Sequence, residues 1–289
     1  MDSRTLLKTD VSTINIPIKD VDPGKYYHFG IANGIRNHYI EKDENIIKLV
    51  IGIDGLPLTK SSKSTFWPIL CYIRPFSKIV FPIGIYWVYD KPTDSNDFLR
   101  DFYDEIVNIL TNGIQIKNKS GVIRNTQVII DTFCCDVPAK SFILKTKGHS
   151  GFFSCSRCCT EGEYLNRCVC FPDLNCSERT HEHFVQKQQE HHIGTDLSII
   201  TCIPGIDIIN VFSIDYMHLI CLGVTKKLIT LWLKGPLKTR LNSVKNKFLS
   251  NNLIDLKNVI PIDFHRKPRG LDELPRWKAT EFRTFLLYL

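Results

Sequence analysis

The alternation of apolar and polar positions predicts a sheet followed by a helix in the first half of the chain. Three segments rich in β-branched and aromatic residues, 46–54, 65–73 and 81–89, have the composition of strands and are joined by short connections, as in an antiparallel meander. Residues 95–113 repeat apolar side chains at spacings of one, three and four, which predicts one buried helix face. A short apolar run at 128–130 predicts a fourth, buried strand.

Three strands, a helix and a fourth strand is an element order that resembles the ribonuclease H-like fold, a mixed α/β sheet with flanking helices. In that fold the first and fourth strands lie side by side, so we assign residues 45–148 to the first part of such a core. Residues 1–44 are polar, with a turn signal at Asp22-Pro23-Gly24, and predict an irregular N-terminal flank. Its aromatic residues Tyr26, Tyr27 and Phe29 suggest that this flank packs on the main body.

The second half of the chain differs in composition and in its hydrophobic pattern. Residues 149–206 are rich in Cys and His and have weak hydrophobic periodicity, which predicts an insertion stabilised by metal. Residues 207–289 predict the helical second part of the core, with a helix at 213–233, a polar linker, and a last helix from Pro275. The chain ends inside that apolar helix, so we expect a C-terminal truncation.

Composition narrows the class of protein. The chain has 289 residues, 43% of them hydrophobic, and we expect no membrane span because no run of about 18 uncharged apolar residues occurs. Eleven cysteines without a secretory signal favour reduced thiols and metal ligation over disulfides. The net charge of +7 is compatible with a polyanionic partner but does not require one.

Two aspartates stand where predicted strands end. Asp54 closes the strand at 46–54, and Asp136 follows the strand at 128–130. Because the predicted strands are neighbours, we expect both carboxylates at one edge of the sheet, where open α/β sheets place their chemistry. The structural alternatives are a turn residue in Asp54-Gly55 and a helix N-cap before Val137-Pro138. A cap role and a metal role are compatible.

A second candidate site is Cys155-x-x-Cys158, whose spacing suits zinc. Structural zinc takes four ligands, so this pair is half a site. The candidates for the other ligands are His191, His192 and His218. The remaining thiols of this region are spare ligands or buried residues: Cys168, Cys170 and Cys176.

These residues resemble the transposase-domain proteins of CACTA-type (En/Spm-like) elements. The matching motifs run in order from about residue 46 to the end of the chain. They are Ile53-Asp54-Gly55-Leu-Pro-Leu-x-Lys-Ser-Ser, Cys135-Asp136-x-Pro-Ala, Lys147-Gly-His149-Ser-Gly-x-x-x-Cys155-x-x-Cys158, Glu190-His-His192-x-Gly, Asp215-Tyr-Met-His218-Leu-x-Cys-Leu-Gly-Val and Trp277-Lys-Ala-x-Glu281-Phe-Arg.

The resemblance implies a DDE/D-type DNA transposase in the nucleus, with DNA (element ends and target) as its partner and possible assembly as a homo-oligomer. It implies Mg²⁺ or Mn²⁺ at three carboxylates, Asp54, Asp136 and Glu281, with Asp215 as the rival of Glu281. It also implies Zn²⁺ in the insertion. The cations around this segment are candidates for phosphate contacts, or else solvated surface charges: Lys140, Lys145, Lys147 and Arg157.

Two other functions compete with this interpretation. A non-catalytic, domesticated nuclear zinc protein that binds DNA or proteins would keep the same scaffold, and the abrupt end of the chain favours it over a complete enzyme. An enzyme with Cys135 as nucleophile and His149 as base is the third alternative, although the sequence shows no oxyanion-hole loop.

Overall fold

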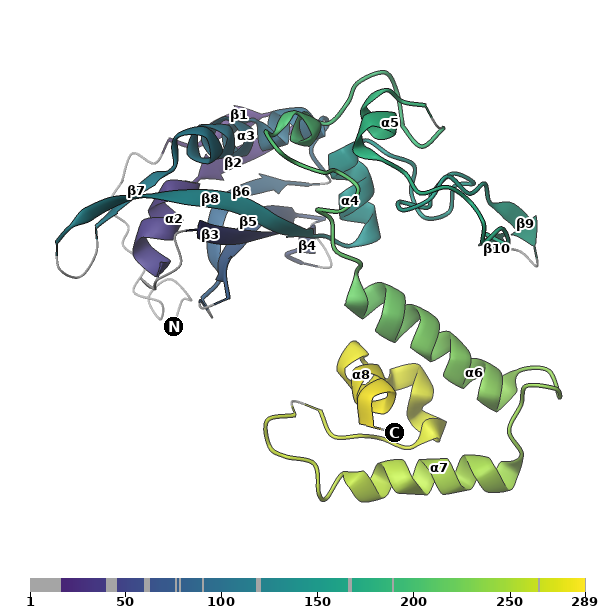
Figure 1. Cartoon of the computed structure of the whole chain (residues 1–289). Helices are drawn as coiled ribbons and strands as arrows, with labels where there is room; N and C mark the ends of the chain where they lie inside the picture. Colours follow the sequence, from purple (N-terminus) through teal and green to yellow (C-terminus); the bar gives the residue numbers. More distant parts are fainter. Residues whose placement is uncertain are drawn as a thin grey trace. The chain divides into compact units, whose positions relative to one another are not determined.

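The chain divides into two compact units, Met1–Ser213 and Ile214–Leu289. The computed structural model (Figure 1) describes residues 17–39, 46–59, 63–75, 77, 79–89, 91–117, 121–165, 168–188, 190–264 and 266–288. The predicted boundary at 44/45 and the Lys-Ser-Ser of the first motif, 60–62, lie outside the described residues.

The first unit is built on a large curled mixed sheet with helices. Among the described residues eight strands form it, in the order β1-β2-β6-β5-β3-β8-β7, with β4 beside β5. Their bounds are β1 Lys19–Val21, β2 Gly24–His28, β3 Ile46–Ile53, β4 Leu56–Pro57, β5 Thr65–Arg74, β6 Phe81–Val88, β7 Ile114–Lys117 and β8 Ile123–Cys134.

The strand pairing confirms the predicted core of this sheet. β3, β5 and β6 form the expected antiparallel meander. β3 and β8, the predicted first and fourth strands, pair in parallel from Ile46–Gln127 to Gly52–Cys134, with a bulge at Asp131. The alternating side chains of β3 from Ile47 to Ile53 are buried in one core with those of β5 and β6.

Helices that contribute to that core include α2 (Ile31–His38), α3 (Ser95–Asn112) and α4 (Val137–Leu144). The predicted apolar face of α3 is confirmed, since Phe98, Leu99, Phe102, Ile106 and Ile109 are all buried. Burial of such a face, rather than helix propensity, supplies most of a helix's stability in a protein.

The prediction of an irregular N-terminal flank is wrong for residues 17–39. β1 and β2 extend the sheet beyond β6, and α2 packs on α3. Tyr26 is 2% exposed and its hydroxyl lies 2.9 Å from His28 Nδ1, so this tyrosine belongs to the core. The strands are short and polar, so their pattern gave no signal of a sheet edge.

Glu105 of α3 ties α2 to the core. Its carboxylate accepts the N–H groups of Ile31 at 2.6 Å and Ala32 at 3.0 Å, and it pairs with His28 Nε2 at 2.8 Å. Burial opposes ionisation of Glu105, but these hydrogen bonds outweigh it and lower the pKa of the carboxyl group.

We expect Glu105→Ala to lower the free energy of unfolding by about 2–4 kcal/mol, because two helix N–H groups and His28 lose their acceptor. The neighbouring, exposed Asp104 is the matched control, and Asp104→Ala should change stability by less than about 0.5 kcal/mol. Urea denaturation measures both.

The contribution of Glu105 should also depend on pH. Since folding lowers the pKa, the stabilisation is present above the ordinary value and is lost as the pH falls through the folded value. The difference between parent and Glu105→Ala should therefore shrink on acidification. An equal difference at neutral and acidic pH would contradict this account.

The predicted insertion has little regular structure among its described residues. It holds a hairpin of β9 (Glu163–Leu165) and β10 (Cys168–Cys170), the short helix α5 (His181–Val185) and the 3-10 turn η1 (Ile199–Cys202). The boundary with the C-terminal unit falls at 213/214 rather than at 206/207. Phe212 explains the difference, because it is fully buried in the sheet core and bridges Phe133 in parallel.

The C-terminal unit is helical. The predicted long helix is confirmed as a continuous helix, Tyr216–Lys234, made of a π-helical part (η2, Tyr216–Thr225) and α6 (Lys226–Lys234). The 3-10 segment η3 (Leu271–Arg276) precedes α8 (Ala279–Tyr288), so the last helix starts later than predicted.

The prediction of a polar linker after Gly235 is wrong for most of its length. Residues Ser243–Leu256 form α7, which begins with the Asn242 side chain accepting the N–H of Lys245. Leu253 of α7 is buried in the core of this unit, while the helix is otherwise mostly polar. A single buried position does not produce a periodic signal. His265, in the same predicted linker, lies outside the described residues.

The helix Tyr216–Lys234 is long and apolar enough to cross a membrane, judged by length and composition alone. This differs from the expectation of no membrane span, which required a run without charges and so stopped at Lys226. Cys221, Thr225 and Ile229 of this helix are buried within the C-terminal unit.

Candidate active site

Asp54 and Asp136 leave the sheet at the same edge. Each follows the paired residues Gly52 and Cys134 by two positions, on the adjacent parallel strands β3 and β8. Neighbouring strands are roughly 4.8 Å apart. On the other side of β8, the backbone N–H of Ser213 bonds Phe133, so a further parallel segment ends at this edge.

Both carboxylates have a local role. Asp54 Oδ1 accepts the N–H of Gly55 at 2.8 Å. Asp136 Oδ1 accepts the N–H of Ala139 at 2.7 Å as the N-cap of α4. The turn and cap roles suggested by the sequence are therefore present. A carboxylate offers about four acceptor sites, so one such bond is compatible with binding a metal.

Divalent magnesium fits the chemistry of this pair. Mg²⁺ is commonly bound through one or two carboxylates while water and substrate phosphates complete its shell. Asp54 is exposed and Asp136 is half-buried, so a phosphate can approach this edge. No three His, Cys, Asp or Glu side chains in the described parts of the chain are grouped so that they could hold a metal. If a divalent cation binds at this end of the sheet, Asp54 and Asp136 are the described carboxylates placed to hold it.

Two ionisable groups near Asp136 have pKa values shifted by partial burial. Burial raises the pKa of the Cys135 thiol to about 12. This protonated thiol argues against the nucleophilic enzyme with Cys135 and His149. Burial and the nearby Arg157 lower the pKa of Lys140 to about 8, and its ammonium group lies 5.1 Å from the centre of the Phe212 ring.

Both candidates for the third carboxylate are engaged within the C-terminal unit. Glu281 binds the Arg269 guanidinium, with contacts of 2.7 Å and 2.9 Å, and accepts the N–H of Lys278 at 2.8 Å. Asp215 caps η2 through the N–H of His218 and lies 2.7 Å from that ring's Nδ1. Glu281 is the more deeply buried, with its side chain 2% exposed against 12% for Asp215.

The thiols of Cys155 and Cys158 face one another in a tight turn. Their sulfur atoms are 3.2 Å apart, and Cys155 Sγ accepts the N–H of Cys158 at 3.4 Å. Burial opposes ionisation of Cys155, but the N–H groups of Arg157 and Cys158 outweigh it and lower its pKa. Burial and the Cys155 sulfur raise the pKa of Cys158. The Cys155 thiol is therefore the more easily ionised of the two.

The three candidate histidines have different surroundings. His191 is buried and its Nδ1 donates to the Phe153 carbonyl at 2.6 Å, which leaves Nε2 as the metal-binding atom. Burial lowers the pKa of His191 to about 4. His192 packs on Phe184, and its Nδ1 is buried without a hydrogen-bond partner among the described residues. His218 is exposed beside Asp215.

Zinc therefore finds two converging thiols but no complete ligand set. Within the described ranges no third His, Cys, Asp or Glu joins Cys155 and Cys158 in a metal-binding group. Structural zinc requires four ligands. The present arrangement does not fit a closed zinc site, and we assign zinc no part in the chemistry.

The four cations expected to contact phosphates all have partners inside the protein. Lys140 lies over the Phe212 ring, Lys145 pairs with the Asp94 carboxylate, and Lys147 pairs with the Glu190 carboxylate. Arg157 donates to the backbone carbonyls of Ile209 and Phe212. Arg157 in particular holds the cysteine-rich segment against the end of the sheet.

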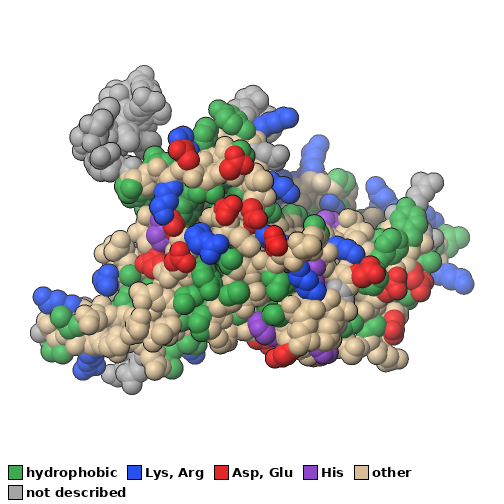
Figure 2. All heavy atoms as spheres, turned by 90° about the horizontal axis from the view of Figure 1, so that it is seen from above, with side chains coloured by type: hydrophobic (Ala, Val, Ile, Leu, Met, Phe, Trp, Pro, Cys, Tyr) green, Lys and Arg blue, Asp and Glu red, His purple; other side chains and the backbone are tan. Residues whose placement is uncertain are grey.

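Positive charge is instead concentrated in the C-terminal unit. Residues 214–289 contain 14 Lys and Arg against 6 Asp and Glu, a net charge of +8, while residues 1–213 carry 23 against 24, a net charge of −1. Figure 2 shows basic and acidic side chains interspersed on the face in view. The whole-chain value of +7 hides this division.

One structural residue of the site gave no sequence signal. Arg179 is 4% exposed, and its guanidinium donates to the carbonyls of Cys155 at 2.9 Å and Phe153 at 3.5 Å. It fixes the backbone that precedes and carries the first thiol. A single arginine in a polar segment has no pattern by which it could have been found.

No protein-family model matches this chain, and no curated protein matches its sequence significantly.

Proposed function

We propose that this chain is the catalytic core of a DDE/D-type DNA transposase, with a ribonuclease H-like fold, that cleaves and joins DNA in the nucleus. The observation that carries the proposal is the pair of aspartates, Asp54 and Asp136, at matched positions beyond the parallel strands β3 and β8. The strand order β6-β5-β3-β8, with three antiparallel strands and a parallel fourth, supports the fold.

The two aspartates would hold divalent magnesium or manganese at the exposed edge of the sheet. Bound there, the metal would supply Lewis-acid stabilisation of charge on the oxygens of a phosphodiester during displacement. Asp136 is fixed by its cap bond to Ala139, and Asp54 by its bond to Gly55. Such fixed positions make little reorganisation necessary when substrate binds.

The basic C-terminal unit supports DNA as the substrate. Its net charge of +8 favours a polyanion, and neutralising phosphates with Lys and Arg releases counterions from DNA. The four cations around the cysteine-rich segment contribute less to this argument because each has a partner within the protein.

A nicking assay on supercoiled plasmid tests the proposal. We expect the purified full chain to nick DNA with Mg²⁺ or Mn²⁺, and not with Ca²⁺ or EDTA, because two aspartates provide oxygen ligands to a small octahedral cation. Activity should fall steeply with salt. Asp215→Asn and Glu281→Gln in the same assay test the third carboxylate.

The competing function is a non-catalytic nuclear protein that binds DNA or proteins. It is favoured by Glu281, whose carboxylate is engaged in an ion pair. A folded chain that binds DNA without nicking it under any of these conditions would establish this function and exclude the transposase.

A further inference from the structure

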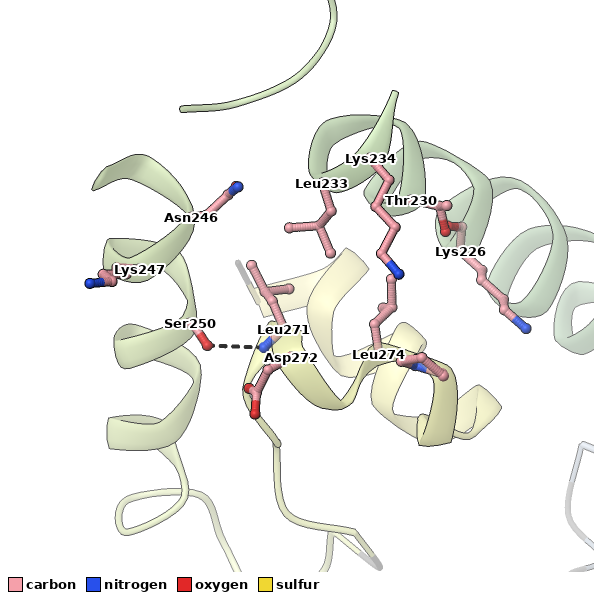
Figure 3. A pocket seen from close by; sticks show the side chains of 11 residues that line it. Lys226, Thr230, Leu233, Lys234, Asn246, Lys247, Ser250, Leu271, Asp272 and Leu274 are labelled. Atoms are coloured by element: carbon pink, nitrogen blue, oxygen red, sulfur yellow. Dashed lines mark hydrogen bonds between the residues drawn. The ribbon is translucent and has the colours of Figure 1, made fainter. Parts of the chain in front are cut away.

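A cavity in the C-terminal unit lies between α6, α7 and η3 (Figure 3). Its volume is about 530 Å³, within the roughly 300–1,000 Å³ of ligand sites. All of its lining residues belong to Lys226–Pro275, so the cavity is formed by this unit alone. None of them takes part in the proposed metal site.

The interior of the cavity is aliphatic. Leu233 of α6 and Leu271, Leu274 and Pro275 of η3 provide its apolar surface. No aromatic residue is among the described residues that line it. Nucleobases bind proteins by stacking on aromatic rings, so this wall suits branched aliphatic side chains better than bases.

The cavity is surrounded by positive charge. Lys226 and Lys234 of α6 and Lys247 of α7 line it, against one carboxylate, Asp272. Lys234 extends from α6 toward η3 in Figure 3. None of the three lysines forms an ion pair with another described residue. The ammonium group of Lys234 lies near the apolar surface, while Lys226 and Lys247 point outward from the rim of the cavity (Figure 3). Apolar surface with positive charge at and beyond its rim complements a ligand with apolar side chains and carboxylates.

An unpaired acceptor distinguishes a peptide from a nucleic acid backbone. Asn246 Oδ1, in the wall of the cavity, is buried and has no hydrogen-bond partner among the described residues, whereas Asn246 Nδ2 donates to Leu241. Buried polar atoms are almost always hydrogen-bonded. Because this oxygen is buried, a ligand reaches it only when the Asn246 side chain turns toward the cavity; it then offers an acceptor to a peptide N–H, a donor that a phosphodiester lacks.

We propose that this cavity binds an acidic amphipathic segment of a partner protein, with its large aliphatic side chains against Leu233, Leu271 and Leu274 and its carboxylates beside the three lysines. Amphipathic helices bind apolar grooves in this way through residues spaced three or four apart. The charge of the unit would steer an acidic partner to it. The proposal is independent of the transposase function.

The test is fluorescence anisotropy of the full chain with a labelled 16-residue peptide that has Leu on one helical face and Glu elsewhere. Two control peptides replace all Leu by Ala or all Glu by Lys. We expect saturable binding of the first peptide, and at least about tenfold weaker binding of each control, because the cavity requires both apolar and acidic side chains.

Matched variants locate the site. The combined substitution of Lys226, Lys234 and Lys247 by Glu should weaken binding at least about tenfold. The same change in charge at Lys227, Lys238 and Lys257, which do not line the cavity, should weaken it less than about threefold. Thr230→Trp should block the cavity, and Thr230→Met serves if the larger side chain disturbs folding, which circular dichroism monitors.

Three outcomes would overturn the proposal. If the two sets of lysine substitutions weaken peptide binding equally, the binding is general electrostatic attraction and not binding at this cavity. Unchanged binding by folded Thr230 variants would exclude the cavity. The third is competition: if a 20-base-pair duplex displaces the peptide, and the same Thr230 variants bind that duplex more weakly, the cavity belongs to nucleic acid.

Discussion

Asp136→Asn is expected to slow metal-dependent DNA cleavage at least about 1,000-fold, equivalent to about 4 kcal/mol, while the protein remains folded. Asparagine is as good a helix N-cap as aspartate, so its side chain can still accept the N–H of Ala139 and start α4. What it loses is the negative charge that would hold a divalent cation in the proposed site. The substitution therefore separates the cap role of Asp136 from its proposed metal role.

Substitution of Asp54, which follows the neighbouring strand β3, should slow cleavage in the same way. Asp54→Asn removes the second carboxylate from the edge and should cause a loss of similar size, and the double variant should be little worse than either single one, because the two groups act as a unit. Single-turnover cleavage rates measure these effects. Mn²⁺ should rescue none of the variants fully.

Asp131→Asn is the matched control for these substitutions. Asp131 lies on β8, the strand that ends two residues before Asp136, but its carboxylate pairs with Arg74 at 2.8 Å. We expect less than about a twofold change in cleavage rate, since a partly exposed ion pair contributes at most about 1 kcal/mol to stability and none to the metal site. If Asp136→Asn and Asp54→Asn cleave as fast as Asp131→Asn, the activity belongs to another nuclease.

The sheet was predictable because its signals are local. The meander of β3, β5 and β6 and the apolar face of α3 follow from β-branched runs and a 3.6-residue period, and the parallel contact of β3 with β8 follows from element order. The N-terminal strands and α7 were missed because each owes its place to one or two buried residues, Tyr26 and Leu253. Tertiary contacts, which no window of sequence contains, decide such elements.

The residues of the candidate site also fall into those that the sequence could predict and those that it could not. Asp54 and Asp136 could be predicted as neighbours because a strand register fixes both. The cysteine pair could be predicted because only two residues separate its members. The ligands proposed from farther along the chain, such as His191, depend on loop geometry, which a spacing motif does not contain. The intramolecular partners of the four cations could not be predicted, because charge alone does not reveal them.

Glu281→Ala is expected to destabilise the C-terminal unit by about 3–5 kcal/mol, whether or not the chain is an enzyme. The Glu281 side chain is 2% exposed, and both of its oxygens bind the Arg269 guanidinium. Truncating it leaves Arg269 without its main partner and the first turn of α8 without the acceptor for the Lys278 N–H. Hydrogen exchange of α8 and urea denaturation measure the loss.

Glu273 provides the matched control, because it contacts the same arginine. Its carboxylate lies 3.3 Å from Arg269 Nη1 and its side chain is 39% exposed, so Glu273→Ala should lower stability by less than about 1 kcal/mol. Similar losses from the two substitutions would show that burial of Glu281 does not strengthen its ion pair.

The pH dependence of the pair identifies the role of Glu281. Burial opposes ionisation of this carboxyl group, but the hydrogen bonds from Arg269 and Lys278 outweigh it and lower its pKa. The stabilisation is then present above the ordinary carboxyl pKa and is lost as the pH falls through the folded value. A structural Glu281 predicts that Glu281→Gln loses stability and cleavage together. A catalytic Glu281 predicts that cleavage is lost while α8 keeps its protection from hydrogen exchange. That result would assign the third carboxylate to Glu281 rather than to Asp215.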